Sequence, residues 1–179
     1  GSREAAVIVF LMFACYLRPG EAFNIRVEDI VKPLQSKRNP GIKHLGIIVG
    51  PQNRDDTVLL DFPDFANDFM SLFLHFRPLS GFILKQAAFN AIFRNAVQHL
   101  GLPANTVAYQ LRHRGASGDS FSQRRSPQQV MARGRWLTLS SVRRHSKPGQ
   151  AKRLLQELPA STQRHAAACA VLVREVAPP

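Results

Sequence analysis

The sequence predicts a mixed α/β fold of the α+β class, mostly α-helical with a small antiparallel sheet. Apolar residues recur at helical spacing in several segments, most clearly in residues 64–76 and 84–100. Two short β-branched runs, residues 45–49 and 57–61, flank a polar turn and read as a hairpin. At 179 residues with 45% hydrophobic content, the chain can bury the core of one domain.

The N-terminal segment, residues 4–17, is predicted to be a buried helix. Its uncharged run is shorter than the about 20 residues that cross a bilayer. A signal-peptide core is the alternative, but Arg18 and Pro19 follow where small cleavage-site residues belong. Pro19 and Glu21 suit the first turn of a second, short helix over 19–26. A polar loop over 33–44 leads to the hairpin.

Helices are also predicted along the second half. One spans 84–100 and stops at Gly101, and another spans 108–121. Residues 126–129 (Ser-Pro-Gln-Gln) form a capping box that begins a short helix to about residue 133. Ser140 or Ser141 caps the next helix, which Pro148 ends. We place the domain in residues 1–150 and a C-terminal helical tail, docked on its own core or on a neighbour, in residues 151–179.

Positive charge is concentrated in residues 112–153, which hold eleven Lys or Arg and one acid, Asp119. This segment carries +10 of the net charge of +12. So dense a charge requires a polyanion, of which DNA or RNA phosphate is the usual one and an anionic membrane surface the next. Apolar residues such as Trp136 and Leu137 are interleaved with the charges, so we expect the segment to fold and to fix their positions.

Cysteine usage points to a reducing compartment. Cys15 and Cys169 lie far apart in apolar runs, so we predict two buried free thiols and an intracellular protein, nuclear in a eukaryote and otherwise cytoplasmic. The sequence has neither a metal-ligand cysteine spacing nor a Gly-rich phosphate loop. We therefore predict no metal and no cofactor.

Three short motifs carry the candidate chemistry. Residues 17–21 (Leu-Arg-Pro-Gly-Glu) place Arg18 at the start of a helix, and residues 109–113 read Tyr-Gln-Leu-Arg-His. The third motif is residues 134–136 (Gly-Arg-Trp), and His145 follows nine residues after Trp136. Each motif alone is a weak signal, whereas their order and the nine-residue interval together are more specific.

This order and spacing resembles the catalytic domain of the tyrosine recombinases, the integrase and Cre-like family, over roughly residues 5–147. In the family, an arginine opens a helix and a hairpin lysine follows. Next come H-x-L-R-H, a His or Trp in a turn, and a nucleophilic Tyr nine residues on. The resemblance implies DNA recombination and integration by strand cleavage and rejoining, on double-stranded DNA. It also implies self-association through the tail. The family's separate N-terminal DNA-clamping domain has no counterpart here, so we expect a fragment or a reduced protein.

Matched residue by residue, the resemblance assigns a phosphate clamp. Arg18 takes the role of the first arginine and Arg112 that of the second, since two planar guanidinium groups can hold the two non-bridging oxygens of a phosphodiester. Trp136 takes the His/Trp role, in which its indole N–H donates to a phosphate oxygen or its ring buttresses the site. His113 would support the helix that carries Arg112.

The chain departs from the family pattern at three positions. His145 stands where the nucleophilic Tyr belongs, and Tyr109 stands at the first His, where it could line the pocket as a hydrogen-bonding substitute. The hairpin turn offers Arg54 but no Lys, and arginine is a poor proton donor because it stays protonated. The clamp is thus retained while the nucleophile and the general acid are altered.

His145 leaves three interpretations open. In the first, the position is degenerate and the chain is a DNA-binding relic or a domesticated binder. In the second, His145 is an inactivating substitution in an otherwise competent recombinase. In the third, the imidazole of His145 itself attacks phosphorus. A non-catalytic basic module that binds nucleic acid is the main alternative function, and a membrane-surface protein is a further one; we predict no membrane partner. The residues predicted to contact DNA are Arg54, His113, Arg124, Arg125, Arg133, Arg135, Arg143, Arg144 and Lys147.

Overall fold

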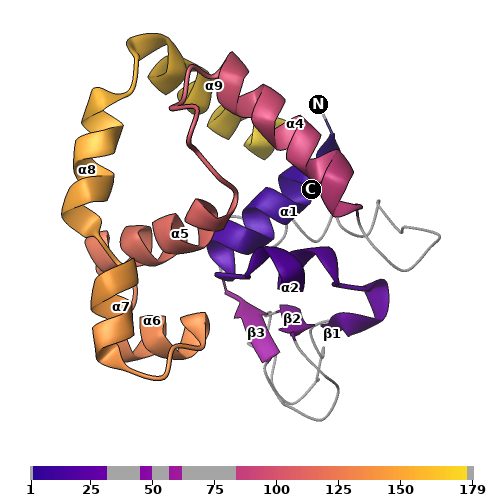
Figure 1. The fold of residues 1–179 in the computed structure, drawn as a ribbon, viewed down its shortest axis with the longest axis vertical. Helices are drawn as coiled ribbons and strands as arrows, with labels where there is room; N and C mark the ends of the chain where they lie inside the picture. Colours follow the sequence, from indigo (N-terminus) through magenta and orange to yellow (C-terminus); the bar gives the residue numbers. More distant parts are fainter. Residues whose placement is uncertain (1, 32–44, 50–56, 62–83, 177–179) are drawn as a thin grey trace.

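The fold is mostly helical, with one small antiparallel sheet at its edge (Figure 1). The structure is a computed structural model and describes residues 2–31, 45–49, 57–61 and 84–176. In these residues the elements are α1 Arg3–Ala14, α2 Pro19–Phe23, the 3₁₀ helix η1 Val27–Asp29, β1 Ile30–Val31, β2 Leu45–Ile48, β3 Thr57–Leu60, α4 Gln86–His99, α5 Tyr109–Phe121, α6 Pro127–Gly134, α7 Leu139–His145, α8 Pro148–Glu157 and α9 Ala160–Val176.

Helix α1 is the centre of the core. Ile8, Leu11 and Met12 on it are fully buried, and it packs against α2, α4 and α5. The Oγ of Ser2 accepts from the N–H of Ala5 at 3.3 Å and caps its start. The helix ends at residue 14, earlier than the predicted 17, because Tyr16 adopts a left-handed backbone with φ of 51°.

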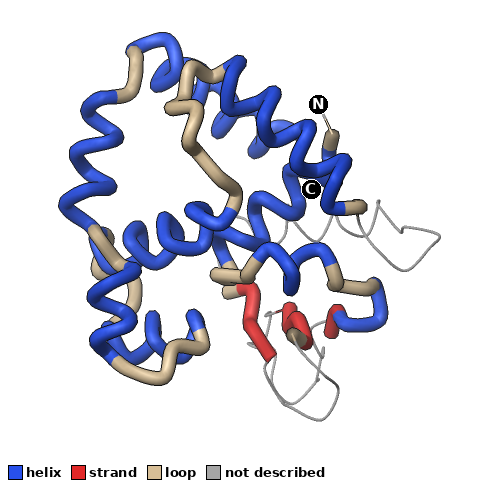
Figure 2. The backbone as a smooth tube through the Cα atoms, in the orientation of Figure 1, coloured by secondary structure: helices blue, strands red, loops and turns tan. Residues whose placement is uncertain are grey.

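The sheet has the order β1-β2-β3, with both neighbouring pairs antiparallel. The predicted strands of the hairpin are confirmed, with Ile47 opposite Val58 and both side chains in the core. The turn between them lies outside the described residues, as does the predicted helix over 64–76. Figure 2 shows the short strands of this sheet gathered on one side of the helices.

Several predicted helices of the second half are confirmed as α4, α5 and α6. The stop at Gly101 has a φ of 62°, and Ser126 forms the predicted capping box with Gln129. The start of α7 was predicted wrongly, because Thr138 and not a serine caps it, with its Oγ1 3.3 Å from the N–H of Ser141. The predicted short helix over 19–26 ends at residue 23, and the separate 3₁₀ helix η1 follows at residues 27–29.

The role predicted for Pro148 was also wrong. Helix α7 ends at residue 145, and Pro148 is the first residue of α8, where its missing N–H costs nothing. Helix α8 packs against α5, and the Oγ1 of Thr162 on α9 donates to the carbonyl of Leu100 at 3.1 Å. The first turn of α9 therefore lies beside the end of α4 (Figure 1).

Helix α5 crosses α1 at close range, because glycine stands at the point of contact. A Cβ at Gly115 would overlap the carbonyl oxygen of Phe13 and lie 3.0 Å from a ring carbon of Tyr16. The carbonyl end of α1 is therefore held directly against α5. This contact brings the residues that follow α1 next to the residues of the first turn of α5.

Both cysteines are free thiols, as predicted, although only Cys15 is fully buried and Cys169 is half-buried. Burial raises the pKa of the Cys15 thiol to about 11, so the thiol is protonated at neutral pH. Across the described ranges, no helix has the length and apolar character needed to cross a membrane.

Candidate nucleic-acid interface

Arg112 is buried where three distant segments meet. Its side chain is 1% exposed, and Nη1 donates to the carbonyl oxygen of Tyr16 at 2.6 Å while Nη2 donates to the carbonyl oxygen of Gly134. Its guanidinium carbon lies 5.2 Å from the ring centroid of Trp136. Arg112 thus joins the end of α1 to the turn after α6, and its Nε has no hydrogen-bond partner among the described residues.

The two backbone segments that accept hydrogen bonds from Arg112 each contain a residue in an uncommon conformation. Tyr16 and Arg135 each have a φ of 51°, which turns the carbonyls of Tyr16 and Gly134 toward the guanidinium. A Cβ at Gly134 would overlap the ring of Trp136. The Gly-Arg-Trp motif therefore has a local reason for its glycine, since only a residue without a side chain lets the indole lie over it.

Glu21 gathers three arginines from three elements. Its Oε1 lies 3.1 Å from Nη1 of Arg18, and its Oε2 lies 3.8 Å from Nη1 of Arg112 and pairs with Nη2 of Arg135. Oε2 also accepts from the backbone N–H of Arg18 at 2.6 Å, which fixes the carboxylate at the start of α2. We call Arg18, Glu21, Arg112 and Arg135 the Glu21 cluster.

The Glu21 cluster carries an excess of positive charge, because one carboxylate faces three guanidinium groups. Burial, then the charge of Arg135 and then that of Arg18 lower the pKa of Arg112 to about 10. Exposure rises outward from Arg112 to Arg135 and Arg18, whose side chains are 14% and 53% exposed. An anion arriving from solvent would meet Arg18 first and would relieve the repulsion among the three cations.

A row of stacked rings runs beside the cluster. Trp136 stacks on Tyr16 at 6.2 Å between ring centroids and on His145 at 5.3 Å. His145 stacks in turn on His113 at 4.4 Å, and the edge of Tyr109 meets His113 at 4.8 Å. His145, the last residue of α7, is therefore held face to face between an indole and a second imidazole.

Both imidazoles are neutral at pH 7. Burial, then His145 and then Arg112 lower the pKa of His113 to about 4. Burial, then Arg112 and Arg144 also lower the pKa of His145. Nδ1 of His113 is buried and has no hydrogen-bond partner among the described residues. The pair contributes ring surface and neutral nitrogen atoms to the site, and the positive charge comes from the arginines.

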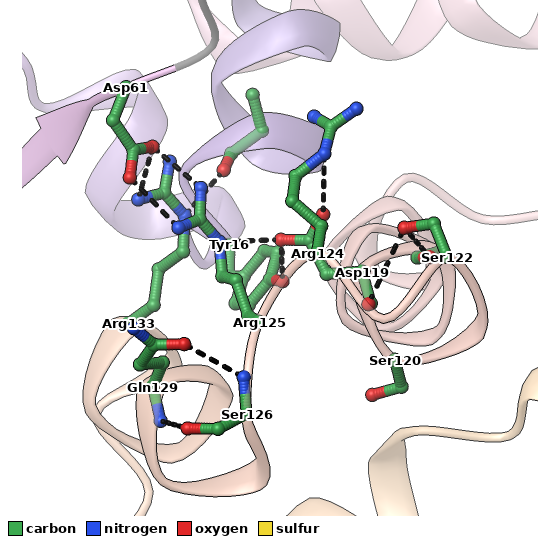
Figure 3. A network of polar contacts seen from close by, with 12 residues as sticks. Tyr16, Asp61, Asp119, Ser120, Ser122, Arg124, Arg125, Ser126, Gln129 and Arg133 are labelled. Atoms are coloured by element: carbon green, nitrogen blue, oxygen red, sulfur yellow. Dashed lines mark hydrogen bonds and ion pairs between the residues drawn. The ribbon is translucent and has the colours of Figure 1, made fainter.

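A second polar network lies inside the molecule and supports Tyr16 (Figure 3). The hydroxyl of Tyr16 donates to Asp119 at 2.5 Å, and Nε of Arg125 donates to the same carboxylate at 2.7 Å. Arg125 also binds Asp61 at 2.6 and 2.8 Å, and Arg133 pairs with Asp61 at 3.0 Å. Although burial opposes it, Arg125 and Arg133 lower the pKa of Asp61. The network ties β3 to α1, α5 and α6.

The residues predicted to contact DNA divide into groups. Arg125 and Arg133 face inward: their side chains are 11% and 7% exposed, and Nε of Arg133 donates to the carbonyl of Ala14 at 2.8 Å. Arg124 is partly exposed, with Nε 3.9 Å from Asp119. Three of these residues are exposed on the surface: Arg143, Arg144 and Lys147. Arg135 lies in the Glu21 cluster, and His113 lies in the row of rings. Arg54 falls outside the described residues.

The predicted site residues Arg18, Arg112, Trp136 and His145 are brought together, directly or through one neighbour. Tyr109 reaches this group through the contact of its ring with that of His113. Sequence reasoning missed Glu21 as the shared carboxylate, although its position three residues after Arg18 was a usable signal for a capping box.

Asp119 and Asp61 were missed as well, and neither carries a local sequence signal for its partners. Within the described residues, no group of three or more His, Cys, Asp or Glu side chains could hold a metal ion. Comparison with protein-family models found no match for this chain. A search of curated proteins likewise found no similar sequence.

Proposed function

We propose that this chain binds double-stranded DNA as a tyrosine-recombinase-like domain and holds a backbone phosphate at the Glu21 cluster. One observation carries the proposal: Arg18, Arg112 and Arg135, from segments far apart in sequence, meet at a single carboxylate. An excess of guanidinium groups over carboxylates at one place is the arrangement expected for a phosphate site, because planar guanidinium forks match phosphate oxygens.

The cluster also suggests how the roles are divided. Arg18 and Arg135 are the arginines with exposed surface, so they contact the phosphate oxygens. Arg112 already donates to two backbone carbonyls, so it supports the phosphate through its charge and by fixing the two carbonyl-bearing segments. Glu21 holds the arginines in place in the absence of DNA, and phosphate oxygens replace some of its contacts on binding.

We further propose that the chain binds DNA without cleaving it. The family's reaction requires a hydroxyl at the position of His145, which attacks phosphorus while the 5′-oxygen leaves with a proton. His145 offers no hydroxyl, and its ring is stacked between Trp136 and His113. This stack favours the second candidate function, a binding module derived from a recombinase, over an active recombinase.

DNA binding at the cluster is tested with Arg18→Ala, because this arginine is exposed and its loss leaves the core intact. We expect about tenfold weaker binding to a duplex at fixed salt, since a hydrogen bond to a charged group contributes about 1.5–3 kcal/mol. Arg94→Ala, which removes the same charge from the exposed surface of α4, is the matched control. Equal effects of the two substitutions would place the DNA elsewhere.

Cleavage is tested with a nicked duplex that traps a covalent protein–DNA adduct, detected as a band shift on a denaturing gel. The native chain should form none, and His145→Tyr tests whether the remaining groups support cleavage when a hydroxyl is restored. His145→Phe keeps the ring without the hydroxyl and controls for stacking. An acid-labile adduct of the native chain would identify phosphohistidine and overturn the proposal of binding without cleavage.

Two other partners also attract clustered positive charge: RNA and an anionic membrane surface. A binding measurement distinguishes each of them from duplex DNA. A module directed to RNA would bind an RNA hairpin more tightly than a DNA duplex at the same salt concentration. A membrane-surface protein would bind vesicles that contain anionic lipid as tightly as it binds DNA at equal ionic strength. Either result would replace double-stranded DNA as the partner.

A further inference from the structure

A basic hollow lies beside the two imidazoles, between α5, α7 and the start of α8. Its walls include Arg114, Arg144 and Lys147, together with His113 and His145. Among the described residues that line it, none is an acid. None belongs to the Glu21 cluster either, so the hollow is separate from the phosphate site proposed for that cluster.

Local contacts fix the shape of the hollow. The backbone N–H of Lys147 donates to Oγ of Ser117 at 2.9 Å, and the hydroxyls of Ser146 and Ser120 are 2.6 Å apart. These bonds hold the start of α8 against α5, which also packs along α8. The cations on the walls are therefore carried by three helices that are tied together.

The first turn of α8, beside the hollow, has amides without an acceptor in the helix. The side chain of the N-cap residue, Lys147, makes no capping hydrogen bond, and the first helical residue is a proline without an N–H. The next two amides, of Gly149 and Gln150, have no acceptor within the helix, and Gln150 lines the hollow. Helix N-termini with such amides favour anions.

The electrostatic environment agrees with this geometry. Lys147 and Arg114 contribute to the lowered pKa of His113, after burial, His145 and Arg112. Arg144 and Lys147 contribute likewise to the lowered pKa of His145, after burial and Arg112. The walls of the hollow thus disfavour added positive charge, and a negatively charged ligand would be attracted.

We propose that this hollow is a second phosphate-binding site, formed by Arg114, Arg144, Lys147 and the amides at the start of α8. Three cations and helix amides around one concave surface suit a tetrahedral anion with several acceptor oxygens. The phosphate belongs either to the DNA backbone beside the first site, which rests on the proposed function, or to a free phosphate ion.

Binding of free phosphate can be followed through Trp136, the only tryptophan of the chain, because its ring stacks on His145 at the edge of the hollow. We expect inorganic phosphate to change its fluorescence saturably, beyond the effect of NaCl at equal ionic strength. Lys147→Gln should weaken this binding at least tenfold. Lys152→Gln, which removes the same charge from an exposed position on the same helix, should leave it unchanged.

Binding of DNA phosphate is measured by the salt dependence of duplex affinity. Lys147→Gln should reduce the slope of log K against log salt by about 0.9, the value for one lost phosphate contact, and Lys152→Gln should not. If the two variants match in both assays, the second site is refuted while binding at the Glu21 cluster stands. If the native chain binds phosphate at Lys147 but not DNA, the hollow stands and the proposed function fails.

Discussion

The carbonyl oxygen of Tyr16 accepts a 2.6 Å hydrogen bond from Nη1 of Arg112, which lies 96 positions further along the chain. The hydroxyl of the Tyr16 side chain donates to Asp119. One residue therefore connects the Glu21 cluster to the interior network of Figure 3. The arginine that the sequence marks for phosphate binding is also part of the framework that positions the site.

Replacement of Arg112 should cost stability as well as binding. Arg112→Met keeps the length of the side chain but leaves the carbonyls of Tyr16 and Gly134 without a donor. We expect the free energy of unfolding to fall by about 3 kcal/mol, measured by urea denaturation, since each buried unsatisfied group costs about 1–3 kcal/mol. Arg143→Met, on the exposed surface of α7, should change it little. A fully stable Arg112→Met variant would contradict the structural role.

The chain's two tyrosines give a matched test of the interior network. Tyr16→Phe removes the 2.5 Å hydrogen bond to Asp119, and we expect a loss of about 1–2 kcal/mol in the free energy of unfolding. Tyr109→Phe removes a hydroxyl from a residue that is 43% exposed and whose contact with His113 is made by its ring. Equal stability of the two variants, measured by thermal or urea unfolding, would show that the network does not hold Tyr16.

The sequence predicted much of the fold because its signals are local. Capping residues such as Ser126, apolar periodicity along α4 and a stop at Gly101 each act within one turn of chain. The role of Pro148 was predicted wrongly because proline is common both after the end of a helix and at its first residue. Helix α7 begins earlier than predicted, because Thr138 and not Ser140 or Ser141 is its N-cap.

The site was predicted only in part, because the signals in the sequence are local. The three motifs identified Arg18, Arg112 and Trp136, whose proximity the structure shows through Glu21 and the cation–π contact. Charge density alone does not separate arginines that face solvent from arginines that face a buried acid. Arg125 and Arg133 pair with Asp61, which is more than 60 positions away in sequence. No local sequence pattern predicts an ion pair over that separation.

Helix α5 offers two glycines that should respond oppositely to alanine. A Cβ at Gly115 would overlap the carbonyl oxygen of Phe13, and backbone atoms cannot move aside as a flexible side chain can. We expect Gly115→Ala to lower the free energy of unfolding by about 3 kcal/mol or more. At Gly118 the nearest atom, in the ring of Phe13, would lie at 4.0 Å, so Gly118→Ala should raise it by about 0.5–1 kcal/mol.

Chemical denaturation of both variants measures this contrast. The alanine at position 118 controls for helix propensity, because both substitutions add the same methyl group to the same helix. If Gly115→Ala were as stable as Gly118→Ala, α1 and α5 would not approach as closely as described, and the bond from Arg112 to Tyr16 would lose its basis.

The stacked imidazoles should make the stability of the protein fall in mild acid. The pKa of His113 is lowered to about 4 in the folded chain, whereas an unfolded histidine has an ordinary value of about 6.5. Between these values the unfolded state binds the proton and the folded state does not, so the free energy of unfolding decreases as pH falls from about 6.5 toward about 4. His145, whose pKa is also lowered, adds to the effect with the same sign.

The share of His113 in this decrease is obtained by comparing variants at several pH values. His113→Gln should show a shallower loss of stability between pH 7 and pH 5 than the native chain, while retaining the part that belongs to His145. His99→Gln, which removes an exposed histidine from α4, should keep the native slope. If His113→Gln keeps the native slope too, burial, His145 and the neighbouring cations do not lower the pKa of this imidazole in the folded chain. The neutral imidazole described beside the hollow would then be wrong.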